Sequence, residues 1–352
     1  MINLVSLDNK DKINILYKIN NYNNPDKIYI PSIYIDKKIK LNDYIYKNTY
    51  FKDYIVSISG YITGVEKIKY NNKLMEALVI TNDYKENVLK KSKKIKLNNK
   101  EELEFILKNN FFNNILNELN KQKNIENLII TSIDEEIYSI NEFMCLKENY
   151  CEILETIDLL SNILKPKKTL LVTKNTDFKV IKNVKSIIGT YPNININLVP
   201  DKYLISNKEF LCNYLNINKE NTLIIKTSEL YNIYKLINGK DIINEYIEIT
   251  NEDYDIYING KLMGKKVFEK NIIIDKYINY IVINKTEEIE ETECINCGAC
   301  NKICPMNIYV KKCFINKLNH KKCIGCGLCN YICPANINLK EIVKSDKIEE
   351  NN

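Results

Sequence analysis

Two short cysteine runs near the carboxyl end of the chain constrain its fold more than any other feature of the sequence. In each run, gaps of two residues separate three cysteines, a fourth cysteine follows after three residues, and a proline comes next. The first run consists of Cys294, Cys297, Cys300, Cys304 and Pro305. The second consists of Cys323, Cys326, Cys329, Cys333 and Pro334. Because thiolates this close in sequence can converge on one small body, the pattern predicts metal binding.

The spacing C-x2-C-x2-C-x3-C-P is typical of bacterial ferredoxins with two [4Fe–4S] clusters, in which the fourth cysteine of each run binds the other cluster. We therefore assign cluster I to Cys294, Cys297, Cys300 and Cys333. We assign cluster II to Cys323, Cys326, Cys329 and Cys304. Glycines within the runs permit close approach of the backbone to a cluster. The expected chemistry is electron transfer, and no catalytic side chain is predicted.

Zinc and disulfide bonds are the alternative interpretations of these cysteines. Zinc sites usually combine two well-separated cysteine pairs, which differs from four cysteines followed by a proline. Disulfides require an oxidising compartment, and the N-terminal residues lack the pattern of a secretion signal. Nine of the 12 cysteines lie after residue 290. Oxygen-sensitive clusters at these positions predict a reducing, cytoplasmic location.

The composition limits the remaining function classes. A chain of 352 residues is long enough for two or three domains. The net charge is +6, and all 51 basic residues are lysines, which we attribute to the codon usage of an AT-rich genome. There is no basic stripe with interleaved aromatic residues, so we predict no nucleic-acid binding. No uncharged apolar stretch is long enough for a transmembrane helix.

For the first part of the chain, residues 1–85, the sequence predicts a leader over residues 1–24 and a small β barrel or sandwich after it. Short alternating segments separated by turn residues support this prediction. A generic β module is the alternative. The expected strands are residues 28–30, 33–35, 44–46, 54–59, 61–63 and 76–81. A lysine-rich connector follows at residues 85–96.

Residues 86–244 predict a largely parallel, three-layer α/β domain, because strand and helix patterns alternate. Asn99 and Glu102 form a capping-box pattern before a helical apolar stripe. The stripe consists of Leu103, Ile106, Leu107, Phe111, Ile115, Leu116 and Leu119. Strands are expected at residues 128–131, 169–173, 196–199 and 222–226. Helices are expected at residues 150–164, 178–188, 208–215 and 228–239, the last one capped by Ser228.

Residues 245–290 return to a β pattern, with strands expected at residues 246–249, 255–258, 266–268 and 280–283. The module that contains the cysteines is assigned to residues 291–345. An α/β sheet of this kind commonly binds nucleotides through a glycine-rich turn. No glycine lies between Gly64 and Gly189, and the chain lacks arginine for a bidentate phosphate contact.

Four segments resemble a known family. Residues 39–48 are similar to the pattern V-x-V-G-D-x-V-x-K-G, with asparagine in place of both glycines, and residues 57–64 are similar to P-V-S-G-x-V. Residues 260–264 are similar to G-P-M-M-G, and residues 294–306 are close to the family's cluster segment. These patterns resemble the RnfC family of the Rnf electron-transport complex and its relatives, including proline-reductase-associated electron-transfer proteins of anaerobic clostridia.

The resemblance implies four modules in a fixed order. They are a barrel-sandwich hybrid domain at residues 1–85, an α/β domain like the flavin- and NADH-binding 51-kDa subunit of complex I at 86–244, a β-grasp-like segment at 245–290, and a two-cluster ferredoxin module at 291–345.

The chain departs from the family where the family binds flavin. Residues 109–116 stand in place of the loop G-L-G-G-A-G-F-P-T, residues 131–138 in place of N-G-A-E-C-E-P-Y, and residues 199–206 in place of Y-P-Q-G-G-E. We carry over no flavin or NADH residue, and we predict that neither FMN nor NADH binds tightly. Asp134, Glu135 and Glu136 are interpreted as a solvated turn.

The other cysteines and the single histidine are interpreted as structural. Cys313 is expected to be a spare buried thiol, and His320 an exposed loop residue, with tuning of cluster II as its alternative role. Cys145, Cys151 and Cys212 are scattered along the chain and are expected to be structural. Lysines near the clusters either attract an acidic redox partner or are the ordinary surface residues of such a genome. They are Lys302, Lys311, Lys312, Lys321 and Lys322.

The sequence thus predicts an iron–sulfur subunit that relays electrons through two clusters inside a larger redox complex of an anaerobe, with protein subunits as donor and acceptor. The first alternative is an FMN-containing NADH oxidoreductase subunit. The second is a docking scaffold of a redox assembly. Peripheral association with the cytoplasmic face of the membrane, through partner subunits, is compatible with all three.

Overall fold

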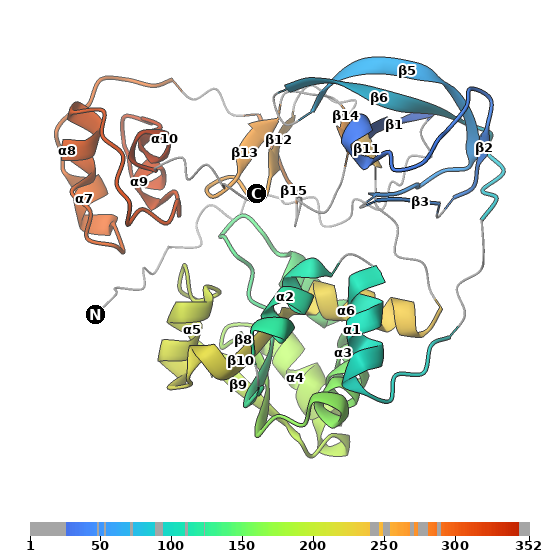
Figure 1. Ribbon diagram of the computed structural model, residues 1–352. Coiled ribbons are helices and arrows are strands. Elements are labelled where there is room, and N and C mark those ends of the chain that lie inside the picture. The colour runs from blue at the N-terminus through green and yellow to red at the C-terminus, as the bar shows by residue number, and fades with distance from the viewer. Residues whose placement is uncertain are drawn as a thin grey trace.

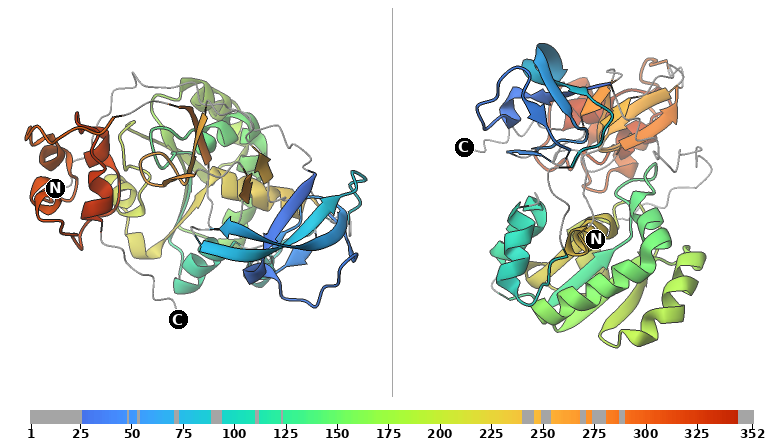
Figure 2. Two further views of the ribbon diagram at one scale, coloured as in Figure 1. Left: turned by 90° about the horizontal axis from the view of Figure 1, so that it is seen from above. Right: turned by 90° about the vertical axis from the view of Figure 1, so that its right-hand side faces the viewer.

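A computed structural model describes residues 26–344 with gaps at residues 48, 53, 71–72, 89–93, 110–111, 123, 240–245, 249–253, 268–270, 274–280 and 287–289. The expected leader at residues 1–24 and the side chain of Phe111 lie outside the described residues. The N-terminal sheet and the cysteine-rich module lie at opposite ends of the molecule, with the central α/β part between and below them (Figures 1 and 2).

The N-terminal part is built from antiparallel strands. Its four-stranded sheet has the order β1-β6-β5-β2, and a hairpin pairs β3 with β4. The bounds are β1 (Lys27–Pro31), β2 (Tyr44–Ile45), β3 (Tyr50–Phe51), β4 (Tyr54–Ile55), β5 (Gly60–Tyr70) and β6 (Lys73–Asn82). Alternate residues such as Ile28 and Ile30 point into one core, as expected of strands with one buried face.

One of the strands expected in this part, at residues 33–35, does not form. Residues 32–34 form a 3-10 helix, η2 (Ser32–Tyr34), instead of a strand. The hydroxyl of Tyr34 reaches the hydroxyl of Tyr70, 2.7 Å away, in the buried interior. This long-range pairing buries Tyr34 without a strand, so the short alternation in the sequence was misleading.

The central part contains a four-stranded parallel sheet of order β10-β7-β8-β9. The strands are β7 (Asn127–Thr131), β8 (Lys168–Lys174), β9 (Ile194–Val199) and β10 (Thr222–Lys226). Leu128 and Ile130 belong to the core on one face, while Ile129 belongs to the core on the other. The strands are therefore buried on both faces, as in other parallel sheets. The predicted parallel α/β arrangement is confirmed at this level.

Helices cover both faces of this sheet. They are α1 (Lys100–Asn109), α2 (Asn113–Lys121), α3 (Asn141–Leu164), α4 (Phe178–Ile187), α5 (Lys208–Leu215) and α6 (Thr227–Ile237), with short 3-10 turns η3 (Ile188–Thr190) and η4 (Lys219–Asn221). Side chains of α3, α4 and α6 belong to one core, and Leu211 of α5 belongs to the opposite one.

Three helix boundaries differ from the sequence prediction. The apolar stripe that begins at Leu103 spans two helices, α1 and α2, and not one. Helix α3 begins nine residues before the expected residue 150, and Asn149 breaks its regular geometry. Ser228 lies inside α6 and is not its cap; its hydroxyl donates to Glu142 at 2.7 Å. Distant side chains determine these positions, so local patterns did not predict them.

The remaining β strands link the sheet region to the cysteines. β12 (Tyr254–Ile258) lies between β13 (Lys265–Val267) and β15 (Ile281–Lys285) in an antiparallel sheet, and β11 (Tyr246–Glu248) pairs with β14 (Asn271–Ile273), a strand not expected from the sequence. The cysteine-rich module has four short helices, α7 (Ala299–Ile303), α8 (Val310–Ile315), α9 (Leu328–Tyr331) and α10 (Leu339–Val343). Within the described ranges, none of the helices has the length and apolarity needed to cross a membrane.

Candidate metal centre

The cysteine-rich module is built from two similar halves. Each residue of the first half has a counterpart 29 positions later, so that Cys294 matches Cys323 and Lys311 matches Lys340. The local hydrogen bonds repeat as well. Asn301 accepts from the Lys311 amide at 2.9 Å, and Asn330 accepts from the Lys340 amide at 2.7 Å. The two halves therefore present their cysteines in similar ways.

A positive φ recurs at the same place in both halves. Gly298 and Gly327, with φ of 70° and 74°, directly precede α7 and α9. Most residues with a side chain avoid this region, so glycine lets the cysteine loop turn into the helix that carries the next cysteines.

Cysteines from both halves line one small pocket. Three of them come from the first run and the fourth comes from the end of the second run: Cys294, Cys297, Cys300 and Cys333. The other lining residues are mainly apolar and include Phe314, Ile337 and Leu339. This composition equals the set that the crossed assignment predicts for cluster I.

The cysteines assigned to cluster II form a second group. Burial raises the pKa of the Cys326 thiol to about 11, and the neighbouring Cys304 and Cys323 add to that rise. Burial also raises the pKa of Cys329 to about 12, with Cys326 and Cys323 close enough to contribute. Cys304, from the first run, is therefore close enough to Cys326 of the second run to raise its pKa.

The donor chemistry of these two groups fits iron–sulfur clusters. Buried thiols with raised pKa values resist ionisation, so positive metal ions are needed to hold them as thiolates. Within the described part of the chain, no group of three or more His, Cys, Asp or Glu is arranged to hold a single metal ion. The first set lines one pocket together with mainly apolar side chains, and thiolates are the ligands of iron–sulfur clusters.

The other cysteines have different surroundings. Cys313 is buried, as expected, in the small core between the two halves. Cys212 is also buried and Cys145 is partly buried, which fits a structural role, whereas Cys151 is exposed on α3. The structure pairs none of the twelve cysteines in a disulfide.

His320 is partly buried, so the expectation of a fully exposed loop residue is wrong. Its amide donates to the carbonyl of Val343 at 2.8 Å, and its Nδ1 accepts from the amide of Lys322 at 3.2 Å. The histidine therefore closes the loop before the second run, and its Nδ1 is not available as a donor.

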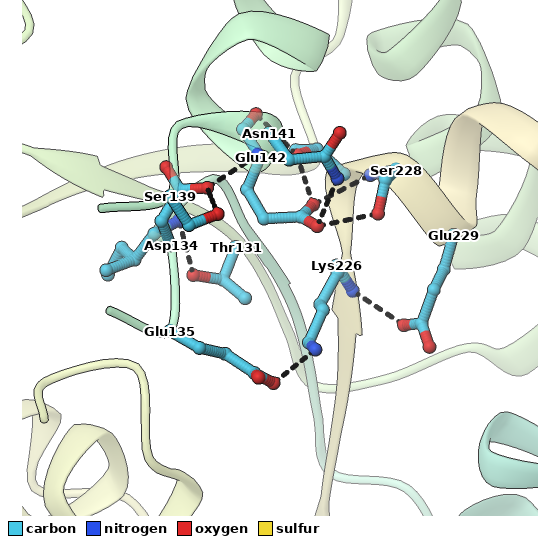
Figure 3. A network of polar contacts seen from close by, with 11 residues as sticks. Thr131, Asp134, Glu135, Ser139, Asn141, Glu142, Lys226, Ser228 and Glu229 are labelled. Atoms are coloured by element: carbon cyan, nitrogen blue, oxygen red, sulfur yellow. Dashed lines mark hydrogen bonds and ion pairs between the residues drawn. The ribbon is translucent and has the colours of Figure 1, made fainter. Parts of the chain in front are cut away.

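The acidic segment after β7 is the clearest difference from the sequence interpretation. Asp134 and Glu136 are 7% and 3% exposed, so a solvated turn is wrong. Asp134 accepts from Ser139 at 3.0 Å and from the amide of Glu142 at 2.9 Å (Figure 3). Burial, with the nearby Glu142 carboxylate, raises the pKa of Asp134 to about 7. These acids are fixed structural groups.

A second cavity lies where the strand order reverses, between the carboxyl ends of β7 and β10, the usual nucleotide position in open α/β sheets. Three carboxylates line it: Glu118, Glu135 and Glu229. Lys226 pairs with Glu135, and its amide donates to Glu229 at 3.0 Å (Figure 3). A phosphate in this crevice would therefore lie next to mostly negative charge. The sequence has no glycine-rich loop here whose backbone N–H groups could offset that charge.

Comparison with known proteins supports the interpretation of the cysteines. A family profile described as "4Fe-4S dicluster domain" matches residues 293–337. The C component of the ion-translocating oxidoreductase complex of Buchnera aphidicola subsp. Acyrthosiphon pisum (strain APS) is 23% identical over 239 residues, which are 55% of this chain and 50% of that protein. The chain thus spans about half the length of the curated relative it matches.

These two similarities cover different lengths of the chain but agree with each other. The profile covers both cysteine runs, and the curated relative extends over more than half of the sequence. The chain is therefore similar to the RnfC component of the Rnf electron-transport complex and contains a 4Fe-4S dicluster domain.

Proposed function

We propose that the chain is an iron–sulfur electron-transfer subunit that holds two [4Fe–4S] clusters within a larger complex of the Rnf type. The observation that carries this proposal is the cavity shared by three cysteines of the first run and Cys333 of the second. A single run cannot provide this set. Crossed ligation of two neighbouring clusters is the known arrangement with this spacing.

The side chains of the module suit such a role. Cys294, Cys297, Cys300 and Cys333 would hold cluster I, and Cys323, Cys326, Cys329 and Cys304 cluster II. When bound, such clusters accept and release single electrons. Apolar residues shared by the halves, including Ile308, Ile337 and Leu339, exclude water from between the cysteine groups.

The domain organisation belongs to the same proposal. We infer a barrel-sandwich hybrid at residues 1–85, a domain related to the 51-kDa subunit of complex I at 86–244, a β-grasp-like segment at 245–290, and a ferredoxin-like module at 291–345. The antiparallel N-terminal sheet, the parallel central sheet and the later small sheets support these boundaries.

We further propose that neither FMN nor NADH binds in the central domain. The crevice at the carboxyl ends of β7 and β10 is lined by three carboxylates, and the Lys226–Glu135 ion pair lies in it. Bound phosphates in α/β domains normally rest on a row of backbone N–H groups at a helix start. The segment after β7 uses its acids for internal contacts instead (Figure 3).

Electrons would then enter and leave through protein partners. Exposed apolar side chains surround the first half of the module, among them Ile295 and Tyr309, which are 65% and 63% exposed. Exposed lysines such as Lys302 and Lys312 lie in the same half. A redox partner with acidic groups around an apolar contact fits this surface. We propose an intracellular site, with attachment to the membrane through partner subunits.

Cofactor analysis of the anaerobically purified protein tests this function. We expect about eight iron and about eight acid-labile sulfide per chain, and no flavin released by acid. Zinc in place of iron would contradict the electron-transfer role. Stoichiometric flavin, with bleaching of the clusters by NADH alone, would favour the FMN-containing alternative. Partner binding that survives removal of iron would favour the scaffold.

A further inference from the structure

A short loop at residues 260–264 is held from one side by a buried carboxylate. Glu136 accepts three backbone hydrogen bonds from this loop, from the amides of Lys261 at 2.6 Å, Leu262 at 2.8 Å and Met263 at 3.2 Å. Hydrogen bonds to a charged acceptor are stronger than neutral ones. Gly260 has φ of 103°, and a Cβ there would lie 2.4 Å from the Glu136 carboxyl group, so the loop can approach only as glycine.

The other side of the same loop is held by a lysine of the cysteine-rich module. Nζ of Lys340 donates to the carbonyl of Leu262 at 2.7 Å and to the carbonyl of Gly264 at 3.1 Å. The loop thus directs its N–H groups toward a carboxylate and its carbonyls toward an ammonium. Both charges favour the same orientation of the peptides, so together they fix the loop.

The contacts continue into the second cysteine run. A Cβ on Gly327 would lie 2.5 Å from the carbonyl oxygen of Leu262, so the two backbones are in close contact. The hydroxyl of Tyr203, in the central part, donates to the carbonyl of Cys326 at 2.6 Å. Leu262 and Leu328 belong to one apolar cluster with side chains of the central part.

The two halves of the module therefore differ in their surroundings. Cys294 and Cys297 of the first half are exposed, whereas Cys326 of the second half contacts the central part. Lys311, the counterpart of Lys340, lines the cavity beside Cys294 and does not belong to the loop contacts. The repeat thus supplies two equivalent lysines, of which only Lys340 bridges to residues 260–264.

We propose that Glu136 and Lys340 are positioning residues, which clamp residues 260–264 and thereby fix the half of the module that holds cluster II against the central domain. Lys340 also belongs to the half that would hold cluster II, since its amide donates at 2.7 Å to Asn330, the residue after the proposed ligand Cys329. A positive charge there stabilises the reduced cluster, which is the more negative state. This inference depends on the proposed function only for its effect on the clusters.

Two measurements on the full-length, anaerobically purified protein test the clamp. The first is hydrogen exchange of the amides at residues 261–263. Lys340→Gln and Glu136→Gln should each raise the exchange rate by about tenfold or more, since each removes a charged hydrogen-bond partner of the loop. Lys311→Gln, the matched control, should leave these amides unchanged. Lys340→Arg keeps the charge and should restore part of the protection.

The second measurement is a redox titration followed by electron paramagnetic resonance. Lys340→Gln should move one midpoint potential to more negative values, whereas Lys311→Gln should act on the other midpoint. An effect of about tenfold in the reduced-to-oxidised ratio corresponds to 59 mV for one electron. Lys340→Arg should restore the potential.

Specific outcomes would overturn the clamp. Wild-type exchange at residues 261–263 in both Lys340→Gln and Glu136→Gln would contradict it. Equal shifts of both potentials in Lys340→Gln would contradict the assignment of Lys340 to the half that holds cluster II. Iron analysis separates these failures from a failure of the proposed function. Normal iron with unaltered exchange refutes the clamp alone. Absent iron refutes the two-cluster function, while the exchange comparison still decides the clamp.

Discussion

The cysteine-rich module and the crevice of the central sheet differ in the kind of group that would bind a cofactor. In the module, eight cysteine side chains provide the groups that would bind a cofactor, and their spacing is visible in the sequence. In the crevice, a nucleotide would depend on backbone N–H groups, and carboxylates occupy the available positions. The first region thus presents side chains suited to a cofactor, while for the second we propose that no nucleotide binds.

The same contrast extends to stability. The central part has an apolar core on each face of its sheet, and its helices are up to 24 residues long. The module has helices of four to six residues and a small core. Helices this short are not stable alone, so the module is expected to need its metal in order to fold, whereas the sheet is not.

Removal of the metal should give the largest effect. After chelation of iron under anaerobic conditions, the amides of α7, α8, α9 and α10 should exchange as fast as in an unfolded chain. Amides of β7 and β8 should keep their protection, because apolar cores hold them. Hydrogen exchange with mass spectrometry reports both regions in one sample. Equal loss of protection in the two regions would remove the distinction between them.

Flavin and nicotinamide binding test the crevice. Each missing hydrogen bond to a phosphate costs about 1.5–3 kcal/mol, and three of them weaken binding by about three to six orders of magnitude. Anaerobic titration with FMN and with NADH should therefore show no binding below about the micromolar range. Sub-micromolar binding of either would mean that the crevice holds a divergent cofactor site.

The contrast also explains which features the sequence predicted. The crossed sets of Cys294 and Cys304 could be proposed from spacing alone, because the doubled run C-x2-C-x2-C-x3-C-P is itself typical of crossed ligation. The parallel sheet could be predicted from alternation of apolar segments such as 128–131 and 169–173. The structure has parallel strands at these two places, β7 and β8, whereas the crossed cysteine sets stay a prediction.

The errors concern residues whose partners lie far away in sequence. Glu136 was interpreted as solvated, yet its partners Lys261, Leu262 and Met263 lie more than 120 positions later. Ser228 looked like a helix cap, but its hydroxyl is used by Glu142, 86 positions earlier. A run of three acids after a strand carries no local sign of such contacts, so only the tertiary structure could reveal them.

The buried acid in the central part predicts a specific pH dependence. The pKa of Asp134 is raised from 3.8 to about 7, by burial and then by Glu142, while Lys174 and Ser139 oppose the rise. The folded state thus binds the proton more tightly than the unfolded state does. The stability that depends on this proton is fully present below about pH 4 and is lost as the pH rises through about 7.

Asp134→Asn should remove that contribution. Between pH 5 and pH 8 the wild-type central domain should lose on the order of 1–4 kcal/mol more stability than the variant does. Urea unfolding, followed by a signal from the central domain at both pH values, measures the difference. Parallel curves for the two proteins would show that Asp134 keeps an ordinary pKa.

The smallest expected effect concerns the surface lysines. If Lys302, Lys312, Lys321 and Lys322 attract an acidic partner, the electron-transfer rate should fall several-fold as salt rises above the physiological range. Lys179 and Lys182, which lie on α4 in the central part, provide a matched pair for control substitutions. A rate that does not depend on ionic strength would mean that the lysines are ordinary surface residues.

The crossed use of the two cysteine runs is the central claim, and single serine variants test it most directly. Electron paramagnetic resonance of reduced Cys294→Ser, Cys304→Ser and Cys333→Ser proteins, with iron analysis, shows which cluster each variant loses. We expect Cys294→Ser and Cys333→Ser to alter the same signal, although the two residues belong to different runs, and Cys304→Ser to alter the other one. If Cys294→Ser and Cys304→Ser alter the same signal while Cys333→Ser alters the other, each run binds its own cluster and the crossed assignment is wrong.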